Sequence, residues 1–464
     1  MMDGAPIRVA IAGGGLAGLA LAAGLAKKPH IDVHVYEAVR EYRDVGAGLA
    51  LHLNATRAMS LIDPGLRQAY LDKALAIAED EDRVMATEVV LAQGPHRGQR
   101  VAELGKAPGR KTVSRADLLD GFLGLVPRRR VSFGKRLVAV EEAGEEAKGE
   151  GPGSRSGGEV TLFFEDGSRA TADCLLGTDG VHSLVRRHML GAEHPAASPK
   201  NHDGWQIYRV MVPTEEALRE IDPKWTQTVP ILLGPRGHIN CIPLNKNTRL
   251  SAGVAIRRGA STGTVAKIRD ETHGDSSQSQ AGPSPLLQSS SPPPLDPEDY
   301  SDYSPDAQAI VRMIASRAGT SQSTSWALSD HDHAPFYARA GSRVAILGDA
   351  AHAALPFAGN GAAQALEDAA VLDCLFGALA SSGCADDVGG GGGNGDKSDG
   401  DGDDGNQERA QAYEAIEDAL LAFDHVRRPR SQAVVDLARK FGRIYAYAED
   451  GSTCTLSLSP PIIF

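Results

Sequence analysis

The sequence predicts an α/β fold in which a parallel, doubly wound sheet is interrupted by a second domain built on an antiparallel sheet. Two observations lead to this prediction. Near the N-terminus an apolar strand, closely spaced glycines, an Ala/Leu helix and a second strand follow one another, the order of a Rossmann-like nucleotide-binding unit. Between residues 204 and 256, short apolar runs alternate with turn residues, which is typical of antiparallel strands.

The length of 464 residues allows two or three domains and two irregular insertions. The insertions, one rich in Ser and Pro and one rich in Gly and Asp, hold few apolar residues, so we expect the first to be disordered and the second to be a flexible loop. The predicted organisation is a nucleotide-binding domain over 1–200 that shares strands with the second domain, the second domain over 201–330 with its insertion at about 271–305, a return to the first domain over 331–450 with the acidic loop at about 382–406, and a tail over 451–464.

Charge and cysteine usage exclude several classes of function. The formal net charge is −12, and residues 386–406, with seven aspartates and one lysine, hold half of the acidic excess. No basic cluster indicates a nucleic-acid partner. The five cysteines are scattered without metal or redox spacing, so we predict reduced thiols, no metal site and a cytoplasmic protein.

The uncharged stretch from Val9 to Ala26 has two interpretations. Because it lies between Arg8 and Lys27, it resembles a signal peptide or a short membrane span. Five of its residues are glycines, however, and a second strand follows directly, which favours a nucleotide-binding turn. We therefore expect no membrane span in this chain.

The first motif places glycines directly after the predicted strand Ile7–Ala12. Gly13, Gly15 and Gly18 fit the G-x-G-x-x-G pattern. The first glycine allows a tight turn, the second lets the backbone approach a pyrophosphate, and the third lets the helix pack on the strand. Glu37 ends the second strand, where an acid bonds the hydroxyls of an adenosine ribose. Together these features indicate a ligand that contains ADP.

A related arrangement of strand, loop and helix lies towards the C-terminus. The apolar run Arg343–Leu347 ends at Gly348 and Asp349, and an irregular loop leads from there into an Ala-rich helix that begins at Ala362. The carboxylate can accept hydrogen bonds from hydroxyls, and the free N–H groups at a helix start favour negative charge. The loop is kept out of regular structure by Pro356, Gly359 and Gly361.

Three other stretches fit the same ligand. A third apolar strand ends at Asp179, again at the start of a turn. Gly48 lies in a run of small residues that suggests a close approach to a flat ligand. Arg115 lies in the first turn of a helix capped by Ser114, where its charge opposes the helix dipole, so we expect it to reach for an anion.

The remaining elements can be placed from periodicity and breakers. A helix is expected from Asp306 to Arg317, and the C-terminal part is expected to hold two helices, Glu408–Val426 and Ser431–Tyr447, with a break at Pro429. The strands of the second domain are expected at Trp205–Val212, Val229–Leu233, His238–Leu244 and Leu250–Ile256.

These motifs together resemble the FAD-dependent aromatic hydroxylases of the single-component kind, close to salicylate hydroxylase. The resemblance implies a para-hydroxybenzoate hydroxylase-type fold, in which a Rossmann-like FAD-binding domain carries an inserted antiparallel-sheet substrate domain. One departure is Asn360, where many relatives carry Gln, so the amide near the isoalloxazine is shorter. The matching residues are Gly13, Gly15, Gly18 and Glu37; Asp179, Gly180, Ser183 and Arg186; Gly348 to His352 with Pro356, Gly359, Gly361 and Glu367-Asp368-Ala369; Arg115; and Arg427 to Arg430, which resemble the C-terminal helix break of the family.

The resemblance implies FAD as cofactor, with NADH or NADPH and O2 as co-substrates. Reduced flavin would capture O2 as a hydroperoxide and transfer one oxygen atom to an aromatic, phenolic acid-like substrate, in a site that excludes water. The implied cofactor-binding residues are Gly13, Gly15, Gly18, Glu37, Gly48, Arg115, Asp179, Gly348, Asp349, Pro356, Gly361 and Ala362.

The implied catalytic residues are Arg209, Tyr208 and His52. Tyr208 and Arg209 lie where the family places a Tyr-Arg pair that faces the flavin and the substrate, and Arg209 is expected to hold a carboxylate or phenolate. His52 and His238 are candidates for polarising a phenol. His352 is expected to be packed within its motif and not to be catalytic.

Two other functions share these motifs. One is a flavin-dependent epoxidase or oxidase of a terpenoid or polyketide, because the motifs contact the flavin and carry no information about the substrate. The other is a non-enzymatic FAD-binding protein, although the intact flavin motifs argue against it. The motifs leave open the substrate, the choice between NADH and NADPH, and the oligomeric state.

Overall fold

Five parallel strands form the sheet that carries the predicted nucleotide-binding motifs. Its order is β17-β11-β1-β2-β7, and every neighbouring pair runs parallel. Both faces of such a sheet are covered, so its central strands are apolar, and every residue of β11 is buried. The strands are β1 (Ile7–Ala12), β2 (Ile31–Glu37), β7 (Val131–Phe133), β11 (Cys174–Gly177) and β17 (Val344–Ile346). The computed structural model describes residues 5–42, 48–74, 84–108, 111–142, 158–258, 293–379 and 404–447.

Helix α1 (Leu16–Leu25) lies at the centre of this first domain. All ten of its residues are buried, and it contacts β2, α4 (Arg115–Leu123) and α9 (Gly361–Ala378). A helix that is apolar on every side requires such surroundings. The uncharged stretch is therefore a core strand, a glycine turn and a core helix. Across the described ranges, no helix combines the length and the apolar composition needed to cross a membrane.

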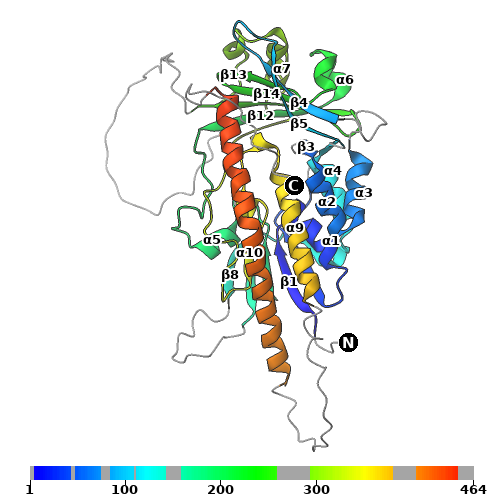
Figure 1. The fold of residues 1–464 in the computed structure, drawn as a ribbon, viewed down its shortest axis with the longest axis vertical. Coiled ribbons are helices and arrows are strands. Elements are labelled where there is room, and N and C mark those ends of the chain that lie inside the picture. The colour runs from blue at the N-terminus through cyan, green and yellow to red at the C-terminus, as the bar shows by residue number, and fades with distance from the viewer. Residues whose placement is uncertain are drawn as a thin grey trace, which may run out of the picture.

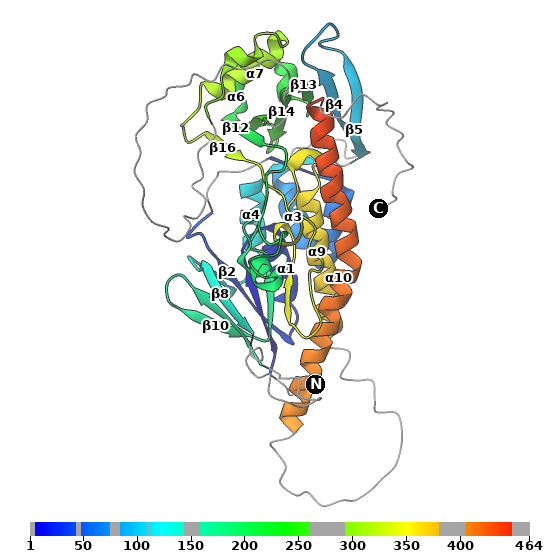
Figure 2. The same ribbon diagram turned by 90° about the vertical axis from the view of Figure 1, so that its left-hand side faces the viewer.

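Smaller elements surround the parallel sheet. A three-stranded sheet, β10-β9-β8, extends from one edge of the domain (Figure 2). A two-stranded ribbon, β3 with β6, contacts the second domain. These elements are β3 (Gly48–Leu51), β6 (Lys111–Ser114), β8 (Leu137–Glu142), β9 (Val160–Phe164), β10 (Arg169–Ala172), α2 (Leu53–Ile62), α3 (Pro64–Lys73), α5 (Leu184–Leu190), α8 (Asp349–His352) and the 3₁₀ turns η1 (Arg128–Arg130) and η4 (Pro356–Ala358).

The second domain is a seven-stranded sheet of order β16-β12-β15-β14-β13-β4-β5. It is antiparallel except for the pair β13–β4, which runs parallel. The four strands expected between residues 204 and 256 are all present, and two more come from the segment before residue 200. The elements are β4 (Val84–Leu91), β5 (Arg100–Pro108), β12 (Trp205–Pro213), β13 (Ile231–Gly234), β14 (Gly237–Leu244), β15 (Arg249–Arg257), β16 (Ser323–Ala327), α6 (Thr214–Ala217), α7 (Pro305–Ala315), η2 (Pro223–Thr226) and η3 (Pro297–Tyr300).

The two faces of this sheet pack against different layers, because successive side chains of a strand point to opposite sides. The outer face packs under α7 in a cluster that includes Tyr208, Val210 and Ile310. The inner face carries Trp205 and Ile207, which pack with residues of η4 and of the last turns of α10 (Asp404–Tyr445). The inner face is therefore the one turned towards the first domain.

The segment predicted to be a disordered insertion is in part ordered. Residues 259–292 lie outside the described residues, but the prediction is wrong for residues 293–304, which include η3. Tyr300 and Tyr303 are 2% and 3% exposed and belong to the core under α7. Two tyrosines within a Ser/Pro-rich stretch supply the apolar surface that its composition does not reveal. Residues 382–403 of the acidic loop and the tail over 451–464 lie outside the described residues.

The predicted break at Pro429 is also wrong, because α10 continues through it from Asp404 to Tyr445. Figures 1 and 2 show this helix running along the length of the molecule beside both domains. Arg427 and Arg430, on either side of the proline, form ion pairs with Glu367 of α9. A proline inside a helix removes one backbone hydrogen bond and crowds the preceding turn. The anchored side chains on both sides hold the helix together across it.

This account predicts that Pro429→Ala stabilises the protein. Restoring the backbone donor and removing the ring should raise the free energy of unfolding by about 1–3 kcal/mol, measured by denaturant titration. Ala433→Pro, one turn further along the same exposed face, should lower it by a similar amount. A loss of stability in Pro429→Ala would show that the proline is required for the path of the helix.

Candidate functional site

The ends of four parallel strands bring the sequence motifs together. β17, β11, β1 and β2 are neighbours in the sheet and run in the same direction, so their C-terminal ends lie along one edge. Gly13 follows β1, Glu37 ends β2, Asp179 follows β11 and Gly348 follows β17. The carboxyl edge of an open parallel sheet is where such folds bind ligands.

The first and third glycines of the first motif are required by packing, as their spacing predicted, whereas the role of the second towards a pyrophosphate stays a prediction. Gly13 has φ +111°, and a methyl group there would overlap the carbonyl of Thr178. A methyl group on Gly18 would overlap the carbonyl oxygen of Gly13. At Gly15 a methyl group would meet nothing within 4 Å. Two glycines are thus required by packing, while the third leaves open space at the start of α1, where a phosphate is favoured.

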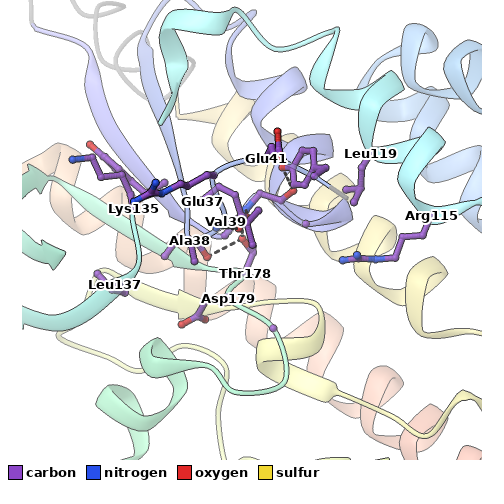
Figure 3. A pocket seen from close by; sticks show the side chains of 18 of the residues that line it. Glu37, Ala38, Val39, Glu41, Arg115, Leu119, Lys135, Leu137, Thr178 and Asp179 are labelled. Atoms are coloured by element: carbon purple, nitrogen blue, oxygen red, sulfur yellow. Dashed lines mark hydrogen bonds between the residues drawn. The ribbon is translucent and has the colours of Figure 1, made fainter. Parts of the chain in front are cut away.

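A cavity of about 670 Å³ opens beside these glycines (Figure 3). Five of the predicted cofactor-binding residues line it: Gly13, Gly15, Glu37, Arg115 and Asp179. In Figure 3, Arg115 reaches towards the cavity from α4 on one side, and Lys135 lies on the other side. Ser114 caps α4 by accepting from the N–H of Asp117 at 3.3 Å, as the sequence predicted.

Glu37 is held in place by the backbone. One of its carboxylate oxygens accepts from the N–H of Gly14 at 2.6 Å, and the other accepts from the N–H of Val39 at 2.9 Å. The hydroxyl of Tyr42 donates to the carbonyl of Gly14 at 2.5 Å. An acceptor at the end of β2, fixed against the glycine turn, is in the position that bonds a ribose in nucleotide-binding folds.

Asp179 uses its carboxylate within the protein. It accepts from the hydroxyl of Ser183 at 2.5 Å and from the N–H groups of Leu184 and Val185 at 2.7 and 3.1 Å. Burial raises the pKa of this carboxyl above its ordinary value. The side chain therefore fixes the turn into α5 and holds Gly180, with φ +78°, at the wall of the cavity.

Arg186 joins the second motif to the third. Its guanidinium is fully buried and donates to the carbonyls of Ala350 at 3.0 Å and Ala351 at 2.6 Å. A third bond goes to the carbonyl of Asp332 at 2.8 Å. Since Gly348 packs against Ala17 of α1, the three motifs form one connected unit. The sequence singled out Arg186 but did not indicate what it binds.

The residues of the third motif lie next to this unit but do not line the cavity of Figure 3. Asp349 is exposed at the start of α8. Asn360 is the N-cap of α9, but its side-chain oxygen accepts from Asn54 at 3.5 Å and does not bond the helix backbone; a methyl group on Gly361 would meet nothing within 4 Å. Pro356 begins η4, and Ala362 lies in the first turn of α9. Free N–H groups at the start of α9 remain available for a negatively charged group.

Gly48 and His52 also lie outside that cavity. A methyl group on Gly48 would press on the side chain of Leu244 at 2.8 Å, so packing between the two domains already accounts for a glycine there. His52 is half-buried at the N-cap of α2. Their roles towards cofactor and substrate remain predictions.

The expectation that Tyr208 and Arg209 face the same site is wrong. They are successive residues of β12, and successive side chains of a strand point to opposite faces. Tyr208 packs in the outer cluster, where its hydroxyl donates to the carbonyl of Pro293 at 2.5 Å. Arg209 has the parity of Trp205 and Ile207, which face inwards. Of these two residues, Arg209 is therefore the one whose side chain is turned towards the first domain.

His238 lies on the inner face within an aromatic cluster. Its ring centroid is 5.2 Å from those of Phe357 and Tyr445 and 6.5 Å from that of Trp205. Its Nδ1 is buried without a hydrogen-bond partner among the described residues. Burial, with a smaller effect of the Arg209 charge, lowers the pKa of His238 to about 3. The imidazole is therefore neutral near pH 7.

Comparison with known proteins gives the family. No family model matches the chain. The 6-methylsalicylate 1-monooxygenase atA of Aspergillus terreus is 31% identical over 446 residues, covering 95% of this chain and 83% of that protein. A salicylate hydroxylase of Pseudomonas putida is 30% identical over 444 residues, covering 95% and 86%. A solved salicylate hydroxylase in a substrate complex has a TM-score of 0.67 and 26% identity over 97% of this chain and 92% of that chain.

This chain belongs to the FAD-dependent monooxygenases related to salicylate hydroxylase. The predicted fold class is confirmed, and the chain is an oxidoreductase with FAD as its cofactor, so the non-enzymatic alternative is set aside. The described residues fit this cofactor, because Gly15, Gly180 and Gly361 all leave open space where a side chain would point. FAD carries a pyrophosphate and a ribose, for which the start of α1 and the fixed carboxylate of Glu37 are suited.

Sequence reasoning missed several residues that shape the flavin site. Thr178 donates to the carbonyls of Gly13 at 2.6 Å and Ala12 at 3.0 Å, which joins the β11 turn to the glycine turn. The position of Thr178 directly after a buried strand could have indicated this role from the sequence. Tyr42 and Lys135 line the cavity from segments outside the helices and strands, so only the tertiary structure shows that they reach it.

Two glycine substitutions should separate packing from cofactor binding. Gly13→Ala should lower the melting temperature of the apoprotein, because its backbone conformation and the Thr178 carbonyl both exclude a side chain. Gly15→Val should leave that temperature within a few degrees of wild type but weaken FAD binding, measured by quenching of flavin fluorescence. Unchanged FAD affinity in Gly15→Val would contradict the placement of the pyrophosphate.

The pKa of His238 predicts acid sensitivity. The unfolded chain binds a proton at His238 below about pH 6.5, whereas the folded chain does so only near pH 3, so stability is lost as pH falls through this window. His238→Phe should reduce the slope of unfolding free energy against pH, between pH 6 and 4, by about 1.4 kcal/mol per pH unit. Replacement of the exposed His425 by Gln is the control, and an unchanged slope in His238→Phe would contradict the assignment.

Proposed function

We propose that this monooxygenase uses NADH or NADPH and O2 to hydroxylate an aromatic substrate that carries an acidic group, such as a phenolic acid. The proposal rests on Arg209. Arg209 is 8% exposed on the inner face of the second domain. Among the described residues no carboxylate or hydrogen-bond acceptor is paired with its guanidinium, and burial is the one cause of its lowered pKa. Its close neighbour is the ring of Trp326, 5.8 Å away. A buried charge is costly unless it is paired, which a bound anion would achieve.

The charge of Arg209 persists at neutral pH. Burial lowers its pKa to about 10, which still leaves the guanidinium protonated near pH 7. A guanidinium presents a planar set of donors that matches a carboxylate or a phenolate. Arg209 would therefore bind the acidic group of the substrate and orient the ring against the flavin.

His238 adds a neutral hydrogen-bonding group to the same face. Its free Nδ1 can accept from, or donate to, a ring hydroxyl without adding a second positive charge beside Arg209. Phe357, Trp205 and Tyr445 form apolar walls around it. Such walls exclude water, which protects a reactive oxygen species from wasteful loss.

The first domain would contribute the cofactor and its electrostatics. Bound FAD would carry the two electrons of NADH or NADPH to O2 and would be the place where O2 is activated. The start of α9, uncapped at Asn360, offers N–H groups that favour negative charge on a reduced ring. Phe357, in η4, joins the motif that leads into α9 to the inner face of the second domain.

The relatives support an acidic aromatic substrate, since the two quoted above are named for salicylates. A second candidate is epoxidation or oxidation of a neutral terpenoid or polyketide. It shares the flavin motifs but gives no role to the unpaired charge of Arg209. The substrate range of the wild-type enzyme distinguishes the two.

Arg209→Met tests this proposal. Loss of a charged hydrogen bond should reduce kcat/KM for a hydroxybenzoate substrate by about tenfold to a hundredfold, with FAD content unchanged. The measurement is NADH or NADPH consumption over a panel of hydroxybenzoates, with the product identified. Arg257→Met is the matched control, because this arginine of the same sheet is already paired with Asp203. The proposal would be contradicted if the wild-type enzyme turned over neutral polyketides but no hydroxybenzoate, or if Arg209→Met kept full activity.

A further inference from the structure

The turn Gly348–His352 is closed by a single buried carboxylate. Asp368 of α9 accepts from the N–H of Gly348 at 2.8 Å and bonds Nε2 of His352 at 2.6 Å, through the same oxygen. Asp368 is 0% exposed. Both ends of the turn that presents Asp349 are thus held by one side chain. As the sequence predicted, His352 is packed within its motif.

The other oxygen of Asp368 is bonded by α10. Arg427 donates from Nε to Asp368 at 2.7 Å, and its remaining donors reach Glu367 at 2.6 Å and the side chain of Gln364 at 2.8 Å. Arg427 is 2% exposed. Burial alone would raise the pKa of Asp368, but its interactions with His352 and Arg427 and the bond from the N–H of Gly348 outweigh burial and lower that pKa to about 2.

We infer that Arg427 is a positioning residue for the flavin, which sets FAD affinity by fixing Asp368 and, through it, the Gly348–His352 turn. This inference rests on the proposed role of that turn in holding FAD. From the opposite side Arg186 bonds the carbonyls of Ala350 and Ala351, so the turn is clamped between α5 and α9. Within the described residues, the hydrogen bonds of the Arg427 side chain go to Gln364, Glu367 and Asp368 of α9, so Arg427 acts on the α9 side of this clamp.

Arg430 provides a matched control on the same helix. It also forms an ion pair with α9, through Glu367 at 2.6 and 2.9 Å, and among the described residues its hydrogen bonds to α9 go to Glu367 and not to Asp368. Both arginines therefore attach α10 to α9, and only Arg427 reaches the carboxylate that closes the turn. A role limited to helix packing would give the two substitutions similar effects.

The test measures FAD affinity and apoprotein stability in the same variants. Arg427→Met should raise the Kd of the apoprotein for FAD, measured by flavin fluorescence quenching, by about tenfold or more. Arg430→Met should stay within about threefold of wild type, although both variants melt at lower temperature. Arg427→Lys keeps the charge that Asp368 requires but lacks the planar fork, so it should fold and still bind FAD more weakly.

Three results would overturn the inference. The first is a Kd within about twofold of wild type in folded Arg427→Met or, should that variant aggregate, in Arg427→Lys. The second is an equal loss of affinity in Arg430→Met. The third is unchanged affinity in Asp349→Ala, whose exposed side chain is not needed for folding, because the turn then does not hold the flavin. Weakened binding in Asp349→Ala with normal binding in the Arg427 variants would overturn this inference alone and leave the proposed function intact.

Discussion

The parallel arrangement of β17, β11, β1 and β2 is the constraint on which the flavin site depends. Parallel neighbours present the same end at one edge, so motifs more than 300 residues apart in the chain, at Gly13 and Gly348, become neighbours. The turn after β1 contacts the turn after β11 so closely that the Thr178 carbonyl excludes a side chain at Gly13, and Gly348 in turn packs against Ala17 of α1. Packing of the backbone therefore brings the parts of the site together, and the polar side chains of the site project from the C-terminal edge of the parallel sheet.

The second constraint is the attachment of the two domains to each other. Helix α10 attaches the two domains to each other. It bonds α9 through Arg427 and Arg430, and near its C-terminal end Tyr445 packs against Phe357 and His238. The flavin-binding elements and the inner face of the substrate sheet thus share one rigid neighbour. A monooxygenase needs the two domains in a fixed relative position, because the flavin is held by one domain and, on our proposal, the substrate by the other.

Local patterns were sufficient to predict the elements of the flavin domain from sequence. Glycine spacing, the acid Glu37 and the capped helix at Ser114 each follow from rules that act within a few residues, and each is found as expected. Local patterns do not predict which side of a strand faces the flavin. Alternation predicts that Tyr208 and Arg209 point opposite ways, but only the packing of α7 on one face shows which of them is turned inwards. The same holds for Pro429, whose effect on α10 is offset by ion pairs to a helix about 60 residues earlier in the chain.

Uptake of FAD by the purified apoprotein is the most direct measurement of the central claim that three distant motifs form one cofactor site. The account predicts saturable quenching of flavin fluorescence with one FAD per chain, and a protein that melts at a higher temperature when loaded than when empty. A folded apoprotein that neither quenches added FAD nor gains stability from it would contradict the account.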